Sequence, residues 1–197
     1  MSPGNGGREL WLVRHGETAA SRGHTLAGWV DVPLTERGEA EASALRTVLA
    51  GERFEDVWSS DLVRAVVSAR LAWGGEPRQE RRLREIHFGD LEGRYWPELE
   101  RTHRKGLERF EGFAAPGGES LAEFRARVLS FVEDLCPGRH LVFTHGGVLR
   151  LLSREVGHDQ FAPTGSLIVL DWDGRRLLRR HDGEGSPPGP VARGDEA

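Results

Sequence analysis

The chain has 197 residues, of which 38% are hydrophobic and 29% charged, and its formal net charge is −4. A chain of this size and composition suits one soluble globular domain with a substantial core. The small net charge excludes the strongly basic balance typical of nucleic-acid-binding proteins and gives no field that would draw the chain to an anionic membrane.

Cysteine usage and hydropathy favour a cytoplasmic location. Cys136 is the single cysteine, so no intrachain disulfide can form and a reducing compartment is expected. No apolar run approaches the ~20 residues of a membrane-spanning helix. Residues 1–7 lack the apolar core of a signal peptide.

Strand and helix patterns alternate along the chain. In the first half we predict a strand over Leu10–Val13, a helix from the capping residue Thr35 to Leu49, a strand over Phe54–Trp58, a helix to Leu71 capped by Ser59-Ser60-Asp61, and an extended piece ending near Leu83. In the second half we predict helices over Glu98–Phe110, Leu121–Leu135 and Gly147–Val156, a strand over His140–Thr144, and a hairpin of Ser166–Trp172 with Arg175–Arg180.

This order of elements predicts one α/β domain over residues 8–182. We expect a three-layer α/β/α sandwich with a mostly parallel central sheet. Residues 1–7 and 183–197 are rich in Gly, Pro or charge and are predicted to be flexible termini.

The first apolar run ends in a motif typical of ligand binding. Arg14-His15-Gly16-Glu17-Thr18 directly follows the strand Leu10–Val13. Open α/β sheets place their ligands at the carboxyl ends of such strands. Gly16 allows a sharp turn and a close approach of substrate to the backbone. Polar pairs at strand ends are common by chance, so this motif depends on the rest of the chain for its meaning.

A second strand end repeats the arrangement. Thr144-His145-Gly146-Gly147 closes the strand His140–Thr144 and opens a helix. Helix amino termini present free N–H groups and a partial positive charge, which favour bound anions. Because parallel strands end at the same edge of a sheet, His15 and His145 are expected to meet at one ligand.

An arginine and a carboxylate complete a phosphate pocket. Arg64 falls in the first turn of a helix that follows a strand, and Glu85 lies in an irregular, glycine-flanked loop. We expect His15 to attack phosphorus and carry the phosphoryl group covalently, while Arg14 and Arg64 hold the non-bridging oxygens. A protonated His145 would add charge to the same oxygens.

Other interpretations of these residues stay open. Glu85 is our candidate for the acid that protonates the leaving group and then activates water. Nearby acids that could serve instead are Asp90, Glu92 and Glu119. The two strand-end histidines could be structural, and Arg64 could be a surface residue of its helix. No cofactor is expected, because arginine and histidine neutralise the charge and the remaining histidines lack metal-ligand spacing.

Several linked motifs resemble the histidine phosphatase superfamily, in its phosphoglycerate mutase-like branch. They are Leu12-Val13-Arg14-His15-Gly16-Glu17-Thr18, Gly28 to Thr35, Ser59 to Ala65, Glu85 to Gly93, Pro116 to Ser120 and Thr144 to Gly147. The resemblance covers Leu10 to about Leu178 and is greatest to alpha-ribazole phosphatases of cobalamin assembly.

The resemblance implies a role for each candidate residue. His15 would be the phosphorylated nucleophile and Glu85 the proton donor, and Arg14, Arg64 and His145 would be phosphate ligands. Further substrate-binding residues implied in the same way are Ser21, Ala27, Gly28 and Gly146.

The chain also departs from the family pattern. Relatives often have Asn where this chain has Ser21, a shorter side chain, and Val66-Val67-Ser68 stands where Arg-Gln-Thr is common. The loops over residues 21–31 and 92–118 would contact the organic part of a substrate. Trp29, Tyr95 and Trp96 in these loops could line the mouth of the site or simply cover the core.

The sequence therefore predicts a cofactor-independent phosphomonoesterase that acts on a small-molecule phosphate ester through a phosphohistidine. Alpha-ribazole 5′-phosphate is the candidate substrate. A phosphoglycerate mutase and a non-catalytic phosphate-binding protein are the alternatives. We expect neither nucleic acid nor a membrane as partner, and a homodimer stays open.

Overall fold

The computed structural model describes residues 6–183, which form a six-stranded sheet in the order β3-β2-β4-β1-β5-β6. The strands are β1 (Arg8–Arg14), β2 (Asp56–Ser59), β3 (Arg78–Gln79), β4 (Gly138–Thr144), β5 (Leu167–Asp171) and β6 (Arg176–His181). β1 to β4 run parallel to one another, and β5 and β6 add an antiparallel hairpin at one edge. The prediction of an α/β fold with a mostly parallel sheet is confirmed.

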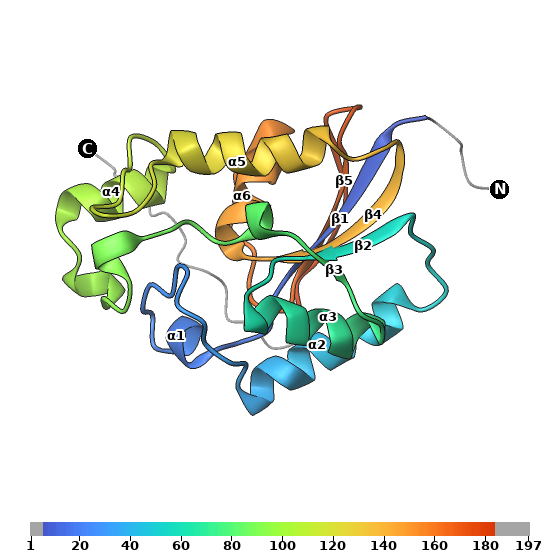
Figure 1. Cartoon of the computed structure of the whole chain (residues 1–197), viewed down its shortest axis with the longest axis horizontal. Coiled ribbons are helices and arrows are strands. Elements are labelled where there is room, and N and C mark those ends of the chain that lie inside the picture. The colour runs from blue at the N-terminus through green and yellow to red at the C-terminus, as the bar shows by residue number, and fades with distance from the viewer. Residues whose placement is uncertain (1–5, 184–197) are drawn as a thin grey trace, which may run out of the picture.

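Helices cover both faces of the sheet (Figure 1). They are α1 (Ala19–Arg22), α2 (Glu36–Leu49), α3 (Val63–Trp73), α4 (Arg101–Arg109), α5 (Leu121–Glu133) and α6 (Gly146–Glu155). Figure 1 shows α2 and α3 on one face, α5 and α6 on the other, and α1 and α4 beyond one end of the strands. Short three-ten turns lie at Arg81–Leu83, Gly89–Leu91 and Trp96–Glu98.

Each face of the sheet has its own apolar core, which follows from the alternation of side chains along a strand. Leu10 and Leu12 of β1 join the cluster that includes Phe124 of α5 and Leu149 of α6. Trp11 and Val13 of β1 join the cluster under α2 and α3. β1 is therefore apolar on both sides, as its continuous hydrophobic run predicts.

Two predicted helix caps are confirmed and one is wrong. The Thr35 hydroxyl accepts a hydrogen bond from Gly38 N at 3.1 Å, and Ser120 and Glu123 form the capping box of α5. Ser59-Ser60-Asp61 does not cap α3, because the helix begins after Leu62, which makes no side-chain cap. Instead, a carboxylate oxygen of Asp31 accepts from Val63 N at 2.8 Å.

The predicted termini lie mostly outside the described residues. At the amino end, Gly7 already accepts a backbone hydrogen bond from Gly138 N at 3.1 Å.

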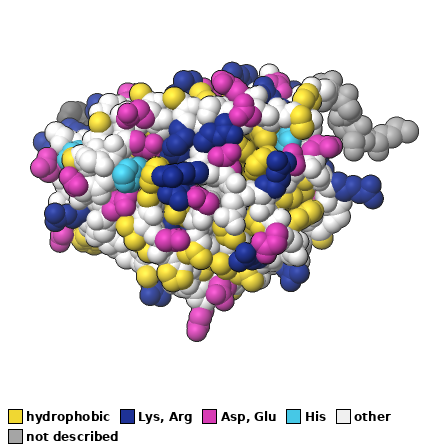
Figure 2. Space-filling view, viewed as in Figure 1, with side chains coloured by type: hydrophobic (Ala, Val, Ile, Leu, Met, Phe, Trp, Pro, Cys, Tyr) yellow, Lys and Arg dark blue, Asp and Glu magenta, His cyan; other side chains and the backbone are white. Residues whose placement is uncertain are grey.

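On the face in Figure 2, positive and negative side chains are interspersed over residues that the structure describes. No helix within residues 6–183 has both the length and the apolar character required to cross a membrane.

The loop after β1 packs directly on the first turn of α2. A Cβ added to Gly38 would overlap the Glu17 carbonyl group, and one added to Gly16 would overlap Gly38. A glycine in a helix is ordinarily less favourable than alanine by about 1 kcal/mol. At this contact, the close approach of the two backbones outweighs that preference.

We therefore predict that Gly38→Ala destabilises the protein. The expected fall in the free energy of unfolding is about 1–3 kcal/mol, because the loop that carries His15 must shift to admit the methyl group. Urea unfolding measures it, with Ala44→Gly at an exposed position of α2 as the control for intrinsic helix propensity. A stabilising Gly38→Ala would show that the contact is not tight.

Candidate active site

Neighbouring strands bring the two predicted histidines together. The parallel register pairs Arg14 with Thr144, so His15 and His145 follow at equivalent positions of β1 and β4. Their ring centroids lie 5.1 Å apart, with the ring planes at 63°. His15 is 6% exposed and His145 is fully buried. The expected meeting of the two imidazoles at one edge of the sheet is what the structure shows.

Hydrogen bonding sets the tautomer of His15. Its Nδ1–H donates to the carbonyl oxygen of Gly16 at 2.7 Å. Because a carbonyl group can only accept, Nδ1 carries the proton and the neutral ring has its lone pair on Nε2. Gly16 N in turn donates to the Ser68 hydroxyl at 3.1 Å, which ties this turn to α3. His15 thus has the nucleophilic nitrogen of its ring free of intramolecular bonds among the described residues.

His145 is oriented by a serine that we had predicted to be a helix cap. Its Nε2 lies 2.8 Å from the Ser60 hydroxyl oxygen. That oxygen also accepts from Leu62 N at 3.3 Å, and in the tautomer in which the hydroxyl donates to Nε2, Ser60 uses both its donor and its acceptor capacity. The neutral ring then carries its proton on Nδ1, a buried atom with no partner in the described part of the chain. Nδ1–H is therefore a donor that an anion could take.

Two arginines supply positive charge that no described carboxylate neutralises by direct contact. Arg14 donates to the Ala162 carbonyl at 2.6 Å, and Arg64 donates to the carbonyls of Gly28 and Val30 at 2.7 and 2.9 Å. Neither forms an ion pair within residues 6–183. The Nε atoms of both are buried and lack partners there. Buried cationic donors without partners favour the binding of an anion.

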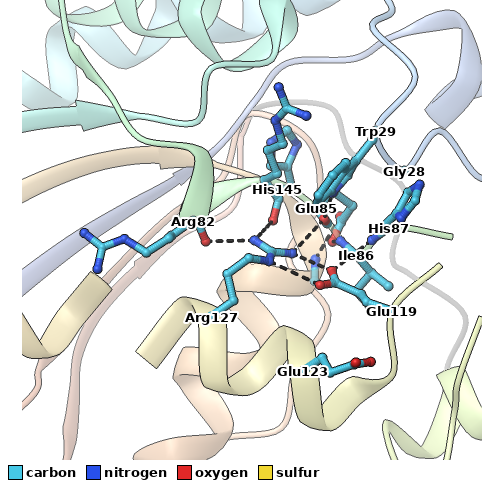
Figure 3. Close-up of polar contacts among 12 residues, drawn as sticks. Gly28, Trp29, Arg82, Glu85, Ile86, His87, Glu119, Glu123, Arg127 and His145 are labelled. Carbon is cyan, nitrogen blue, oxygen red and sulfur yellow. Dashed lines mark hydrogen bonds and ion pairs between the residues drawn. The ribbon is translucent and has the colours of Figure 1, made fainter. Parts of the chain in front are cut away.

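The Glu85 side chain contacts the first turn of α6. One carboxylate oxygen accepts from Gly147 N at 3.1 Å and the other from Ile86 N at 3.0 Å. Its backbone carbonyl accepts from Trp29 Nε1 at 2.8 Å (Figure 3). Both the side chain and the backbone of Glu85 are therefore held in place.

A cavity of about 1010 Å³ opens beside His15. The predicted residues on its lining are Arg14, His15, Ser21, Ala27, Gly28, Arg64, Glu85 and Gly146. His145 does not line it but lies behind, in contact with the His15 ring. The structure thus brings all the predicted site residues to one place, and their individual roles remain predictions.

The alternative acids are separated from this cavity by their own contacts. Glu92 accepts from Trp29 N at 2.8 Å and from Phe88 N at 3.1 Å. Glu119 is paired with Arg127, and none of Asp90, Glu92 and Glu119 is on the cavity lining. Glu85 is therefore the acid, among the four considered, that can contact a ligand at His15.

The two departures from the family pattern are accommodated locally. The Ser21 hydroxyl donates to the Thr18 carbonyl at 3.1 Å and accepts from Thr18 N at 2.9 Å. This capping box forms α1, a short helix between the first predicted strand and the helix capped by Thr35, where no helix was predicted. Val66 is buried in α3, and Ser68 bonds to the loop of His15 as described above.

Of the aromatic residues predicted at the mouth, one lies on the lining. Trp96 lines the cavity, whereas Trp29 stacks on His87 at 4.4 Å between ring centroids and Tyr95 is on the surface. Phe110 and Phe161, which were not predicted as site residues, do line it. Their signal is weak, since Phe110 ends the predicted helix Glu98–Phe110, Phe161 lies outside every predicted element, and neither belongs to a motif.

The buried, positively charged surroundings lower the pKa of both histidines. Burial, followed by the guanidinium groups of Arg64 and Arg14, holds the pKa of His15 well below the ordinary imidazole value. Burial and the charges of Arg64, His15 and Arg14 lower the pKa of His145 in the same direction. Without a bound anion, these surroundings favour the neutral form of both imidazoles. A dianionic phosphoryl group between these residues would act in the opposite direction and raise both pKa values.

The chain belongs to the histidine phosphatase superfamily (branch 1), whose family model matches residues 10–179. Within residues 6–183, no group of three His, Cys, Asp or Glu side chains is placed to hold a metal ion.

Relatives with three different names resemble it. The chain is 37% identical to the adenosylcobalamin/alpha-ribazole phosphatase of Salmonella typhimurium, over 73% of this chain and 76% of that protein. It is 39% identical to the fructose-2,6-bisphosphatase TIGAR of Xenopus tropicalis, over 64% of this chain and 49% of that one, so it spans about half the length of that relative. A structure described as phosphoglycerate mutase from Thermus thermophilus superposes with a TM-score of 0.82 and 49% identity, over 87% of this chain and 97% of the other.

The lowered histidine pKa values predict a loss of stability in acid. In the unfolded chain each imidazole binds a proton below about pH 6.5, whereas the buried rings do not, so stability falls as pH drops through that value. His15→Asn keeps an N–H donor near the Nδ1 position and removes one titrating group. Between pH 7.5 and 5.5 it should lose less stability than the wild type, by about 1 kcal/mol.

Urea unfolding in a phosphate-free and sulfate-free buffer measures this difference. The buffer matters because a bound anion would raise the pKa values. Equal losses in the two proteins would show that His15 titrates normally.

Proposed function

We propose that this protein is a cofactor-independent phosphomonoesterase that works through a phosphohistidine at His15. The observation that supports this most is a free imidazole Nε2 beside two buried guanidinium groups that have no carboxylate partner in the described chain. An anion with several oxygens matches those donors, and a phosphoryl group is the anion that an imidazole can also attack.

In the first step, the ester phosphate binds with its non-bridging oxygens toward Arg14 and Arg64. The Nε2 lone pair of His15 attacks phosphorus and forms a P–N bond, while the bond from phosphorus to the ester oxygen breaks. Protonated Glu85 donates its proton to the leaving oxygen, and the alcohol departs. The hydrogen bond from Nδ1–H to Gly16 stabilises the positive ring that forms.

In the second step, a water molecule attacks the phosphorus of phospho-His15. The Glu85 carboxylate takes the water proton, the P–N bond breaks, and its electron pair returns to Nε2. Inorganic phosphate leaves and Glu85 is protonated again, so the cycle is balanced. His145 donates from Nδ1 to the phosphoryl oxygens in both steps. The negative charge of these oxygens raises the pKa of its ring.

The outer part of the cavity favours a monoester with a flat apolar group. Apolar side chains on its lining are Leu26, Phe88, Trp96, Leu107, Phe110 and Phe161. The cation on this side, Arg150, is paired with Asp159 at 2.6 Å and also donates to the Leu107 carbonyl. Asp159 is neutralised by this pair and by Arg154, so Glu108 supplies the negative charge there. This negative charge would repel a second phosphate group, which disfavours a bisphosphate substrate and bisphosphoglycerate-dependent transfer.

Alpha-ribazole 5′-phosphate fits this description, because it joins one phosphate to a ribose that carries an aromatic base. The name of the Salmonella relative supports the same choice. Phe161 is 53% exposed on the rim, with the guanidinium carbon of Arg14 at 4.9 Å from the ring centroid. It therefore offers an aromatic surface within reach of a group bound beside Arg14.

We predict that His15→Asn abolishes turnover of p-nitrophenyl phosphate and alpha-ribazole phosphate but still binds inorganic phosphate. Wild-type protein quenched during turnover of a ³²P-labelled ester should carry label that is stable in base and labile in acid. EDTA should leave the rate unchanged. Turnover near the wild-type rate in the variant would contradict the mechanism. Absence of turnover in the wild type would favour the non-catalytic alternative.

For the substrate, we predict that Phe161→Ala raises KM for alpha-ribazole phosphate at least about fivefold, the effect expected from loss of one stacking contact. KM for phosphoglycolate, which has no base, should not change. Tyr95→Ala, at a surface aromatic residue outside the lining, is the matched control. Faster turnover of fructose 2,6-bisphosphate or transfer between phosphoglycerates would favour the relatives with those names instead.

A further inference from the structure

The segment that carries Glu85 has no helix or strand to fix its backbone. After the short turn Arg81–Leu83, the chain continues as an irregular loop. The carbonyl oxygens of residues 82, 83, 84 and 85 nevertheless each accept a hydrogen bond from a side chain. Side-chain donors here replace the backbone hydrogen bonds that a neighbouring strand would supply, because buried carbonyl groups need partners.

Most of these bonds come from one residue, Arg127 of α5 (Figure 3). Its Nη1 donates to the carbonyls of Arg82 and Arg84 at 2.8 and 3.0 Å, and its Nη2 donates to the Glu85 carbonyl at 3.1 Å. A guanidinium group has donors in a planar fork that can reach several acceptors at once. With the two further bonds that Arg127 makes to Glu119, the fork donates five hydrogen bonds, and the ammonium group of a lysine has only three donors.

A carboxylate on the other side fixes the fork itself. Glu119 accepts from Arg127 Nε at 3.2 Å and also from Arg127 Nη2. A Glu119 oxygen accepts in addition from His87 N at 2.9 Å, two residues beyond Glu85. The two side chains are 17% and 13% exposed, so water screens their pairing little. Arg127 and Glu119 together hold the backbone before and after Glu85.

We propose that Arg127 is the positioning residue for the Glu85 carboxyl group. The inference rests on the proposed function, in which Glu85 protonates the leaving group. Arg127 is not on the cavity lining, so it acts through the backbone of Glu85 rather than on the substrate. Misplacement of a catalytic group by about 1 Å can cost as much as ~100-fold in rate. Loss of the fork should therefore weaken acid catalysis without weakening phosphate binding.

Leaving groups of different basicity separate this role from a merely structural one. p-Nitrophenolate departs without a proton near neutral pH, whereas an alkoxide such as that of glycerol 1-phosphate needs one. kcat/KM covers the steps through departure of the alcohol. For Arg127→Met we expect kcat/KM to fall about tenfold or more for glycerol 1-phosphate and less than threefold for p-nitrophenyl phosphate. The inhibition constant of inorganic phosphate should be unchanged.

Three further variants complete the experiment. Glu85→Gln should show the same selectivity for the poor leaving group, to a larger extent. Arg125 lies on the same helix as Arg127 and forms an exposed ion pair with Glu155. Arg125→Met should leave kcat/KM unchanged for both substrates. Trp29→Phe removes the second donor to the Glu85 carbonyl and should give a smaller effect of the same kind.

Equal losses on both substrates in Arg127→Met would overturn the proposal. If circular dichroism shows that this variant is unfolded, Trp29→Phe decides: a selective loss supports positioning through the carbonyl group, and an equal or absent loss contradicts it. A Glu85→Gln variant without selectivity would remove the acid role and this proposal with it, while the phosphohistidine could still form. A wild type that hydrolyses neither ester would refute the proposed function itself.

Discussion

Buried positive charge that no described carboxylate contacts directly is the constraint on which this structure depends. Arg14 and Arg64 are held by backbone carbonyl groups and lie beside two buried imidazoles. In such a weakly polar environment a further cation is disfavoured and an anion is favoured. The field that keeps His15 neutral therefore preserves its nucleophilic lone pair and also attracts the phosphoryl group that it is proposed to accept.

The fold supports this charge through contacts among backbone segments that are distant in sequence. The parallel register of β1 and β4 places the two histidines side by side. The segment Gly28–Val30 contacts both the Arg64 guanidinium and, through Trp29, the Glu85 carbonyl. The proposed phosphate site and the proposed acid thus share one loop, so movement of that loop would disturb both. Regular structure places the nucleophile, and side-chain hydrogen bonds place the acid.

Local patterns in the sequence predicted what depends on local interactions. Periodicity located the strands and main helices, and the strand-end rule was enough to bring His15 and His145 together. Local patterns gave the wrong role where a side chain bonds to a residue distant in sequence. Ser60 orients His145 instead of capping α3. Arg127 has the pattern of an ordinary charged position on an amphipathic helix, and only the folded chain brings it to Glu85. Long-range partners of irregular loops have no sequence period to reveal them.

A structure of the protein with orthovanadate tests whether His15 is the nucleophile, because vanadate can adopt the five-coordinate geometry of phosphoryl transfer. We expect a bond from vanadium to Nε2 of His15, with the guanidinium groups of Arg14 and Arg64 and Nδ1 of His145 against the vanadate oxygens. Vanadate bound at another place, or bound in the cavity without contact to His15, would contradict this expectation.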